Sequence, residues 1–112
     1  LSINPGSTST KIAVYDNDIE IKRSTIKHPQ EEIRDFSSIW EQYAYRKQKV
    51  LDWIRENNYG LDEFDAIVSR GGTIIPVPSG VYLINQKMLD DLKSGKYGNH
   101  ACNVGCRINY DL

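Results

Sequence analysis

One stretch decides the fold of this chain: Asn4-Pro5-Gly6-Ser7-Thr8-Ser9-Thr10-Lys11. It is polar and lies between two apolar segments, Leu1-Ser2-Ile3 before it and Ile12-Ala13-Val14-Tyr15 after it. Short apolar runs bounded by turn residues are typical of strands, and Asn, Pro, Gly, Ser and Thr are common in turns. The sequence therefore predicts a strand, a polar turn and a second strand at the amino end.

The composition of this turn is typical of phosphate binding. Gly6 lets the backbone adopt conformations closed to other residues and lets a ligand approach closely. The hydroxyls of Ser7, Thr8 and Ser9 can donate to phosphate oxygens, and successive amides in a tight turn can form an anion-binding concavity. Lys11 adds a cation. The alternative is an ordinary hairpin turn without a ligand, which the same residue types also favour.

Two familiar phosphate loops are excluded by their spacing. A Walker A loop requires a second glycine directly before the lysine and a helix after it, whereas Lys11 is followed by the strand-like Ile12-Ala13-Val14-Tyr15. The dinucleotide pattern G-x-G-x-x-G is absent as well. The predicted phosphate site is thus a hairpin turn between two strands.

Length and composition indicate one domain without special partners. The chain has 112 residues, 39% of them hydrophobic, and a formal net charge of −1. That length is usual for one domain, and the balanced charge gives no reason to expect nucleic acid or a membrane surface as partner. No apolar run is long enough for a membrane span or a secretion signal, so we expect a cytoplasmic protein.

The two cysteines are expected to be reduced. Only three residues separate Cys102 from Cys106, so a bridge between them would constrain little of the chain. His100, Cys102 and Cys106 are also a weak zinc motif, because a closed structural site needs a fourth ligand and none is nearby. We therefore expect no metal site here.

The first half of the chain predicts a meander and a long helix. Residues 1–27 are expected to form three antiparallel strands, with a turn at Asp16-Asn17-Asp18. His28 is expected at the surface. An amphipathic helix should follow, with a break near residues 35–38, and it ends at Asn57-Asn58-Tyr59-Gly60. Its cations are predicted to face solvent: Arg46, Lys47, Lys49 and Arg55.

A buried strand is predicted over residues 64–69, parallel to the central strand of the sheet. Ligands gather at the carboxyl ends of parallel strands, which is where Arg70-Gly71-Gly72 falls. The two glycines allow a sharp turn, and Arg70 offers a fork of donors for a carboxylate or phosphate. Without further support, Arg70 could equally be an ordinary surface charge.

The last third is expected to be extended and then helical. Two prolines keep residues 73–80 extended, and residues 81–84 are predicted as an edge strand or hairpin arm that walls a pocket or packs in the core. Asn85 should cap a helix over residues 86–93, and Asn99 should cap a last helix from His100 to Asp111.

The motifs quoted above resemble the acetate and butyrate kinase family, within the superfamily of sugar kinases, actin and heat-shock ATPases. The opening signature covers Asn4 to Ser9 with Lys11, and Asn4 stands where other branches of the superfamily usually have aspartate. Pro5 and Arg70-Gly71-Gly72 are closer to butyrate kinases than to acetate kinases. The resemblance recurs over residues 93–105 and so spans nearly the whole chain.

This resemblance implies an α/β fold with a ribonuclease H-like mixed sheet, in which an antiparallel meander is followed by a helix and a parallel strand, with flanking helices. Residues 1–112 would be the amino-terminal lobe of a two-lobe kinase. The chain starts at Leu1, without an initiating Met and inside a predicted strand, so we expect that part of the protein is missing. The second lobe would carry the adenosine pocket and most ligands for Mg²⁺, and the isolated chain should be inactive.

The resemblance also implies a reaction. ATP would phosphorylate butyrate or a branched short-chain acid to an acyl phosphate by direct in-line transfer, in a protein that forms homo-oligomers. Asn4, Gly6, Ser7, Thr8, Ser9 and Lys11 would face the phosphates, and Gly71 and Gly72 would form the substrate turn. Arg70 would meet the substrate, and His100 would donate to the phosphoryl or acyl oxygen. Alternatives are an acetate or propionate kinase, a non-enzymatic nucleotide-binding module of the actin or heat-shock type, and a plain interaction module.

Overall fold

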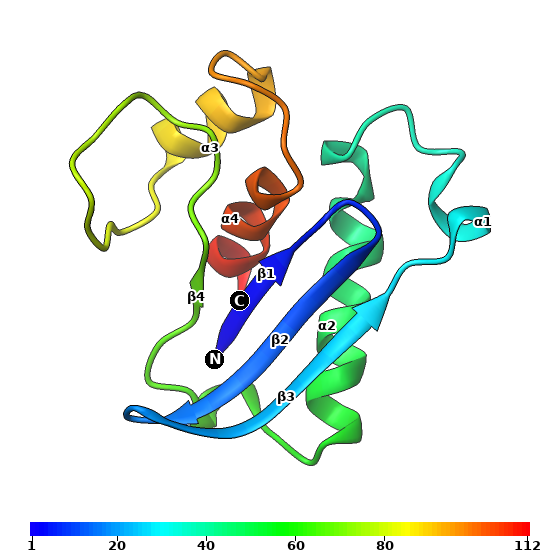
Figure 1. The fold of residues 1–112 in the computed structure, drawn as a ribbon, viewed down its shortest axis with the longest axis vertical. Coiled ribbons are helices and arrows are strands. Elements are labelled where there is room, and N and C mark those ends of the chain that lie inside the picture. The colour runs from blue at the N-terminus through cyan, green and yellow to red at the C-terminus, as the bar shows by residue number, and fades with distance from the viewer.

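The computed structural model describes residues 1–112 as a mixed α/β structure (Figure 1). Its strands are β1 (Ser2–Pro5), β2 (Ser9–Asp16), β3 (Ile19–Lys27) and β4 (Val68–Ser69). Its α-helices are α1 (Gln30–Ile33), α2 (Tyr43–Glu56), α3 (Gln86–Ser94) and α4 (Cys102–Asp111). Two short 3-10 helices, η1 (Trp40–Gln42) and η2 (Leu61–Glu63), complete the set. No helix combines the length and the apolar character that a membrane crossing needs.

The four strands form one mixed sheet in the order β3-β2-β1-β4. β1 pairs with β2 in antiparallel register, with Ile3 opposite Ile12, and β2 pairs in the same way with β3. On its other side β1 pairs in parallel with β4, where Ser2 lies opposite Val68. The predicted antiparallel meander and the predicted parallel strand are both confirmed. Since β1 and β4 are parallel, their carboxyl ends meet at the same edge of the sheet.

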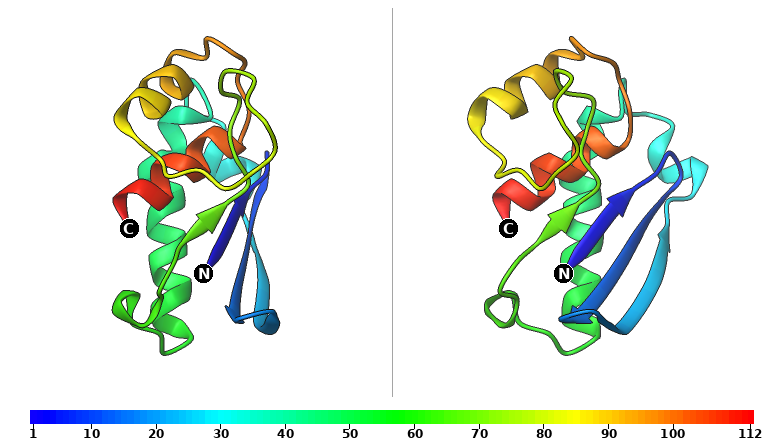
Figure 2. Two further views of the ribbon diagram at one scale, coloured as in Figure 1. Left: turned by 90° about the vertical axis from the view of Figure 1, so that its left-hand side faces the viewer. Right: turned by 60° about the vertical axis from the view of Figure 1, so that its left-hand side comes forward.

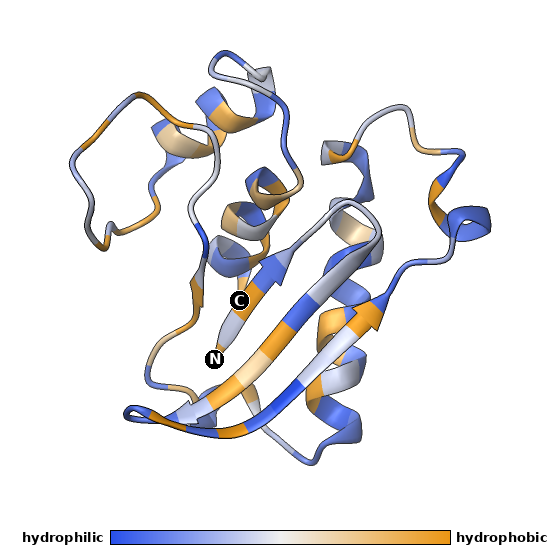
Figure 3. Ribbon diagram, viewed as in Figure 1, coloured by the Kyte–Doolittle hydropathy of each residue, from blue (hydrophilic) through white to orange (hydrophobic).

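The core lies between the sheet and two helices. Figure 2 shows α2 and α4 on the same side of the strands, and Figure 3 shows an apolar stretch in the middle of β2. Side chains of the sheet, of α2 and of α4 form one buried apolar cluster: Leu1, Ile3, Ile12, Val14, Val50, Trp53, Ile54, Val104 and Ile108. Full burial of one such aliphatic side chain contributes about 1.5–3 kcal/mol, so this cluster holds β1 and β2 firmly on the helices.

The break predicted within the long helical region is confirmed. α1 ends at Ile33, and helical structure resumes only at Trp40. The Ser38 hydroxyl oxygen accepts a hydrogen bond of 3.4 Å from the Glu41 N–H close to this new start. Asn85 caps α3 as predicted, because its side-chain oxygen accepts from the Met88 N–H at 3.0 Å.

Two surface predictions are wrong. Arg46 is 0% exposed and His28 is 2% exposed, although both were expected to face solvent. The reason is hydrogen bonding, since the side chain of Arg46 binds backbone carbonyls and the His28 ring binds the Thr10 hydroxyl at 2.8 Å. A buried polar group is tolerated when it is paired in this way. Arg55 is exposed, as predicted, whereas Lys47 and Lys49 are half-buried.

The second half of the chain is less regular than predicted. The strand expected over residues 64–69 is reduced to Val68–Ser69, and Val68 is 48% exposed because β4 is an edge strand. Residues 81–84 do not form the predicted edge strand, and Val81 and Leu83 are more than nine-tenths exposed. Of the four residues only Ile84 packs against the core, on the smaller cluster of Leu89, Leu92 and Cys106. No further strand lies beside residues 81–84 to pair with. The last helix begins at Cys102 with Ala101 at its cap position, so the predicted cap at Asn99 is wrong.

We expect Gly105→Ala to destabilise the fold, because Gly105 lets α4 approach β1 closely. A Cβ atom there would lie 2.9 Å from Cδ of Pro5, and a proline ring cannot rotate away. Overpacking of this kind costs about 1–3 kcal/mol, measurable by urea unfolding. Gly71→Ala is the control, since nothing lies within 4 Å of the added atom. Equal unfolding midpoints for the two variants would contradict the close approach.

We also expect stability to depend on pH through His28. Burial, and then the charges of Arg46 and Lys49, lower the pKa of His28 to about 4. Protonation would also give the buried Nδ1 a hydrogen without an acceptor, since that atom has no partner. The unfolded chain therefore binds this proton more readily than the folded chain. The contribution of His28 to stability should fall by about 3 kcal/mol as the pH drops from about 6.5 to about 4, and this contribution should not change further below about pH 4.

Unfolding midpoints measured over that pH range test the expectation. His28→Gln should flatten the dependence, whereas Lys27→Gln, a change of an exposed neighbour, should leave it in place. If His28→Gln kept the full slope, the acid sensitivity would have to come from other groups.

Candidate functional site: a polar pocket at the edge of the sheet

Three segments meet where β1 and β4 end. The turn of residues 6–8 leaves β1, Arg70 follows β4 directly, and the segment that precedes α4 returns to this edge (Figure 1). A pocket of about 190 Å³ lies there. It is lined by Asn4, Pro5, Gly6, Ser9, Lys11, Arg70, His100 and Cys102.

The structure brings together six of the residues proposed from sequence: Asn4, Gly6, Ser9, Lys11, Arg70 and His100. The other four do not line the pocket. Ser7 and Thr8 lie at the exposed tip of the turn, next to the pocket along the chain. Gly71 is exposed, and Gly72 is packed against α3 and α4.

From the sequence, Gly6, Gly71 and Gly72 were explained by backbone conformations that other residues do not adopt, and the structure does not support this explanation. Neither Gly6, Gly71 nor Gly72 has a positive φ, so none of them is required for an unusual turn conformation. Gly72 is required for space, because a Cβ atom there would lie 2.5 Å from Leu92 Cδ2 and 2.8 Å from Asn103 Oδ1. At Gly6 the nearest atom to an added Cβ is the Ser9 carbonyl oxygen at 3.5 Å, an ordinary contact.

His100 is oriented by the residue that begins α4. The Cys102 N–H donates to His100 Nδ1 at 3.2 Å, and the Cys102 sulfur lies 2.9 Å from the same nitrogen. Burial raises the pKa of the Cys102 thiol, which keeps its proton and can also donate to Nδ1. With Nδ1 as acceptor, the ring proton of the neutral imidazole resides on Nε2. His100 can therefore donate a hydrogen bond from Nε2, and its partner Cys102 was missed from sequence.

The pocket is cationic. Lys11 and Arg70 line it, neither forms a salt bridge, and no Asp or Glu is among the lining residues. Such a surface attracts an anion. It does not fit Mg²⁺, which prefers carboxylate oxygens. No group of three or more His, Cys, Asp or Glu side chains is arranged to hold a metal ion anywhere in residues 1–112.

Arg46 of α2 lies behind the turn and was also missed from sequence. Its guanidinium donates to the carbonyl oxygens of Gly6 at 2.8 Å, of Ser7 at 2.7 Å and of Ser9 at 3.4 Å. The sequence did indicate that Arg46 is buried, because it lies three residues after Tyr43 and four before Val50, on the helix face that packs inward. The residue was predicted to face solvent because it is charged.

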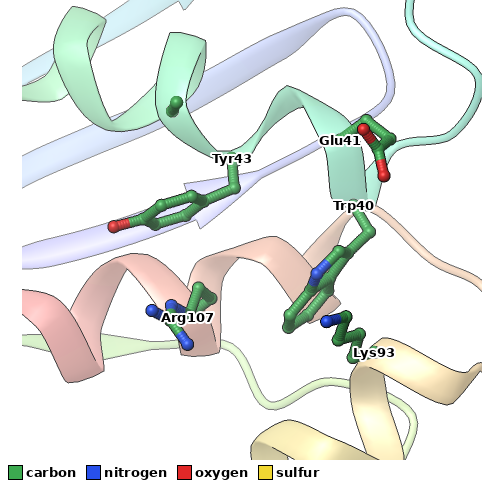
Figure 4. A pocket seen from close by; sticks show the side chains of 6 residues that line it. Trp40, Glu41, Tyr43, Lys93 and Arg107 are labelled. Carbon is green, nitrogen blue, oxygen red and sulfur yellow. The ribbon is translucent and has the colours of Figure 1, made fainter.

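A second and larger pocket, of about 340 Å³, shares no residue with the first (Figure 4). Trp40, Glu41, Tyr43, Ala44, Lys93 and Arg107 line it. The Arg107 guanidinium donates to an Asp111 oxygen at 2.9 Å, and the Tyr43 hydroxyl donates to the same carboxylate. Because this arginine is already neutralised, the pocket at the sheet edge is the better candidate for binding an anionic ligand.

Fold and pocket together define an α/β protein with a cationic pocket at the carboxyl ends of parallel strands. No family model matches the chain. Over 105 residues it is 49% identical to butyrate kinase 1 and 46% identical to butyrate kinase 2, both from Clostridium acetobutylicum. It is 43% identical over 108 residues to a probable butyrate kinase from Listeria monocytogenes.

These matches cover 94% to 96% of the chain, so the chain is similar to butyrate kinases over nearly its whole length. The chain spans about 30% of the length of these relatives.

Proposed function

We propose that this chain forms part of an enzyme that transfers the terminal phosphoryl group of ATP to butyrate or a branched short-chain acid. The observation that carries the proposal is the pocket in which Asn4, Ser9, Lys11, Arg70 and His100 come together. The names of the relatives support the substrate, and they give no support to an acetate kinase or to a non-enzymatic nucleotide-binding module.

The proposed chemistry needs no protein base. A short-chain carboxylic acid is ionised at neutral pH, so one of its oxygens can attack the terminal phosphorus directly. The new bond joins that oxygen to phosphorus, the bond from phosphorus to the bridging oxygen breaks, and ADP leaves. Both reactants are anions, so catalysis consists mainly of positioning and charge neutralisation.

Each side chain has a part in that task. The turn of residues 6–9 and Lys11 bind the phosphates, Arg70 binds the acid, and His100 donates from Nε2 to an oxygen of the transferring group. Mg²⁺, which would neutralise phosphate charge when bound, has no carboxylate ligand in this pocket and would be held by other residues.

We further propose that the sheet is of the ribonuclease H-like type and that residues 1–112 are the amino-terminal lobe of a two-lobe kinase. The order of an antiparallel meander, a helix and a parallel strand supports that fold. The adenosine site would lie on the other lobe, so the isolated chain would be inactive. We expect the complete protein to be a cytoplasmic homo-oligomer that binds neither nucleic acid nor membranes.

The complete protein is expected to form butyryl phosphate from butyrate and magnesium ATP, trapped with hydroxylamine as the hydroxamate. Residues 1–112 alone should give none. Acetate and propionate serve as competing acceptors, because one methylene changes discrimination by about 1–3 kcal/mol in an apolar pocket. ATP hydrolysis without any acyl phosphate would contradict the proposed function and favour a nucleotide switch.

The orientation of His100 gives a sharper test in the complete protein. A glutamine amide nitrogen reaches the position of Nε2, whereas an asparagine amide reaches that of Nδ1. His100→Gln should therefore keep more activity than His100→Asn, and His100→Ala should lower kcat about 100- to 1,000-fold, as loss of a transition-state donor does. The KM for ATP should change little. If His100→Asn were at least as active as His100→Gln, Nε2 would not be the donor.

A further inference from the structure

We propose that Arg46 is a positioning residue for phosphate: it binds the carbonyl oxygens of the hairpin turn so that the N–H groups of Ser7 and Thr8 face the ligand. The inference deepens the proposed function and rests on it, because it assumes that this turn binds phosphate. Arg46 itself does not line the pocket and would act only through the turn.

The guanidinium reaches the turn from within the core. Its Nη1 donates to the Gly6 carbonyl at 2.8 Å and its Nη2 to the Ser7 carbonyl at 2.7 Å. Nε donates to the Gln42 side-chain oxygen at 2.9 Å, one helical turn earlier on the chain. Gln42 is itself 6% exposed, so the fork is held in one orientation by a second buried side chain.

Internal donors bind every carbonyl of the turn. Besides the two contacts of Arg46, the Thr8 carbonyl accepts from the His28 N–H at 2.9 Å, and the Ser9 carbonyl accepts from the Gly6 N–H at 2.7 Å. None of these four oxygens is therefore free to face an anion, which a carbonyl would repel.

The N–H groups of the same peptides point the other way. The chain has no cis peptide bond, and in a planar trans peptide the N–H lies opposite the preceding carbonyl. The N–H groups of Ser7 and Thr8 are thus directed away from Arg46. Neither donates to any acceptor in residues 1–112, and both residues are exposed. Two adjacent free N–H groups in a turn form an anion-binding concavity.

Charge supports the same conclusion. Arg46 is 0% exposed, and no carboxylate forms a salt bridge with it. A buried charge without a partner of opposite sign is costly, even when carbonyl dipoles partly stabilise it. An anion bound on the opposite side of the turn would supply the missing negative charge. Phosphate groups of a nucleotide are the chemical class that fits.

The test compares three variants of the complete protein. Arg46→Met removes both the positive charge and the guanidinium donors. Arg46→Lys keeps the charge, but an ammonium group cannot bind the two carbonyl oxygens in the geometry of the guanidinium. Arg55→Met is the matched control, because it removes an exposed arginine from the same helix. Two-dimensional NMR of the Ser7 and Thr8 amides during titration with inorganic pyrophosphate measures the phosphate contact, and thermal unfolding reports whether each variant folds.

In the wild type and in Arg55→Met we expect pyrophosphate to shift both amide resonances. In Arg46→Lys, with a Tm close to that of the control, these shifts should be lost and kcat/KM for ATP should fall about 100-fold, as it does after a small misplacement of a reacting group. Arg46→Met should show the same losses with a lower Tm.

Two results would overturn the inference: unshifted Ser7 and Thr8 amides in the wild type, or wild-type shifts in a folded Arg46→Lys or Arg46→Met protein. If the wild-type amides shift and Arg46→Lys abolishes the shift, but no butyryl phosphate forms, the inference stands and the proposed reaction falls.

Discussion

The hydrogen bonds from Arg46 to the carbonyls of Gly6 and Ser7 are the constraint on which the polar edge of this structure depends. They join α2 to a turn about forty residues earlier in the chain. Val50, one helical turn further along α2, is 0% exposed in the core with Ile3 and Ile12. The packing that fixes the helix on the sheet therefore also fixes the distance between the guanidinium and the turn.

This arrangement places a polar layer directly beside an apolar one. Arg46 and His28 are as buried as the aliphatic residues, and both bind residues of the hairpin rather than each other. Burial of these groups offers little stability by itself, because desolvation offsets much of the gain from hydrogen bonding. Their effect is to give the turn one conformation, which a solvent-exposed loop of Gly, Ser and Thr would not otherwise keep.

Local patterns predicted much of the fold. Apolar runs and turn residues were enough to predict β1 to β3, and the residue type of Asn85 predicted the cap of α3. The apolar run before Arg70 led to the prediction of a buried strand over residues 64–69. Only Val68 and Ser69 of this run pair with β1, and they form an edge strand. The strand predicted over residues 81–84 is absent for the same reason, because composition does not reveal whether a neighbouring strand is there to pair with.

The pocket itself was predicted in part. Motif resemblance identified Asn4, Ser9, Lys11, Arg70 and His100, which the fold then brings to one edge. The roles of Arg46 and Cys102 at this site were not predicted, because the contacts of Arg46 are long-range and that of Cys102 depends on side-chain direction. A charged residue is usually exposed, and only the contacts of Arg46 with a distant turn reverse that expectation.

Charge also explains why the pocket contains so few reactive groups. In the proposed reaction two anions must approach each other, and their repulsion is the main barrier that a protein can lower. Asp or Glu side chains in the pocket would add to it, and none lines the pocket. Lys11, Arg70 and a histidine that can donate from Nε2 line the pocket and would lower this repulsion. A carboxylate nucleophile is already ionised, so no residue is needed to remove a proton, and the site can consist entirely of donors and cations.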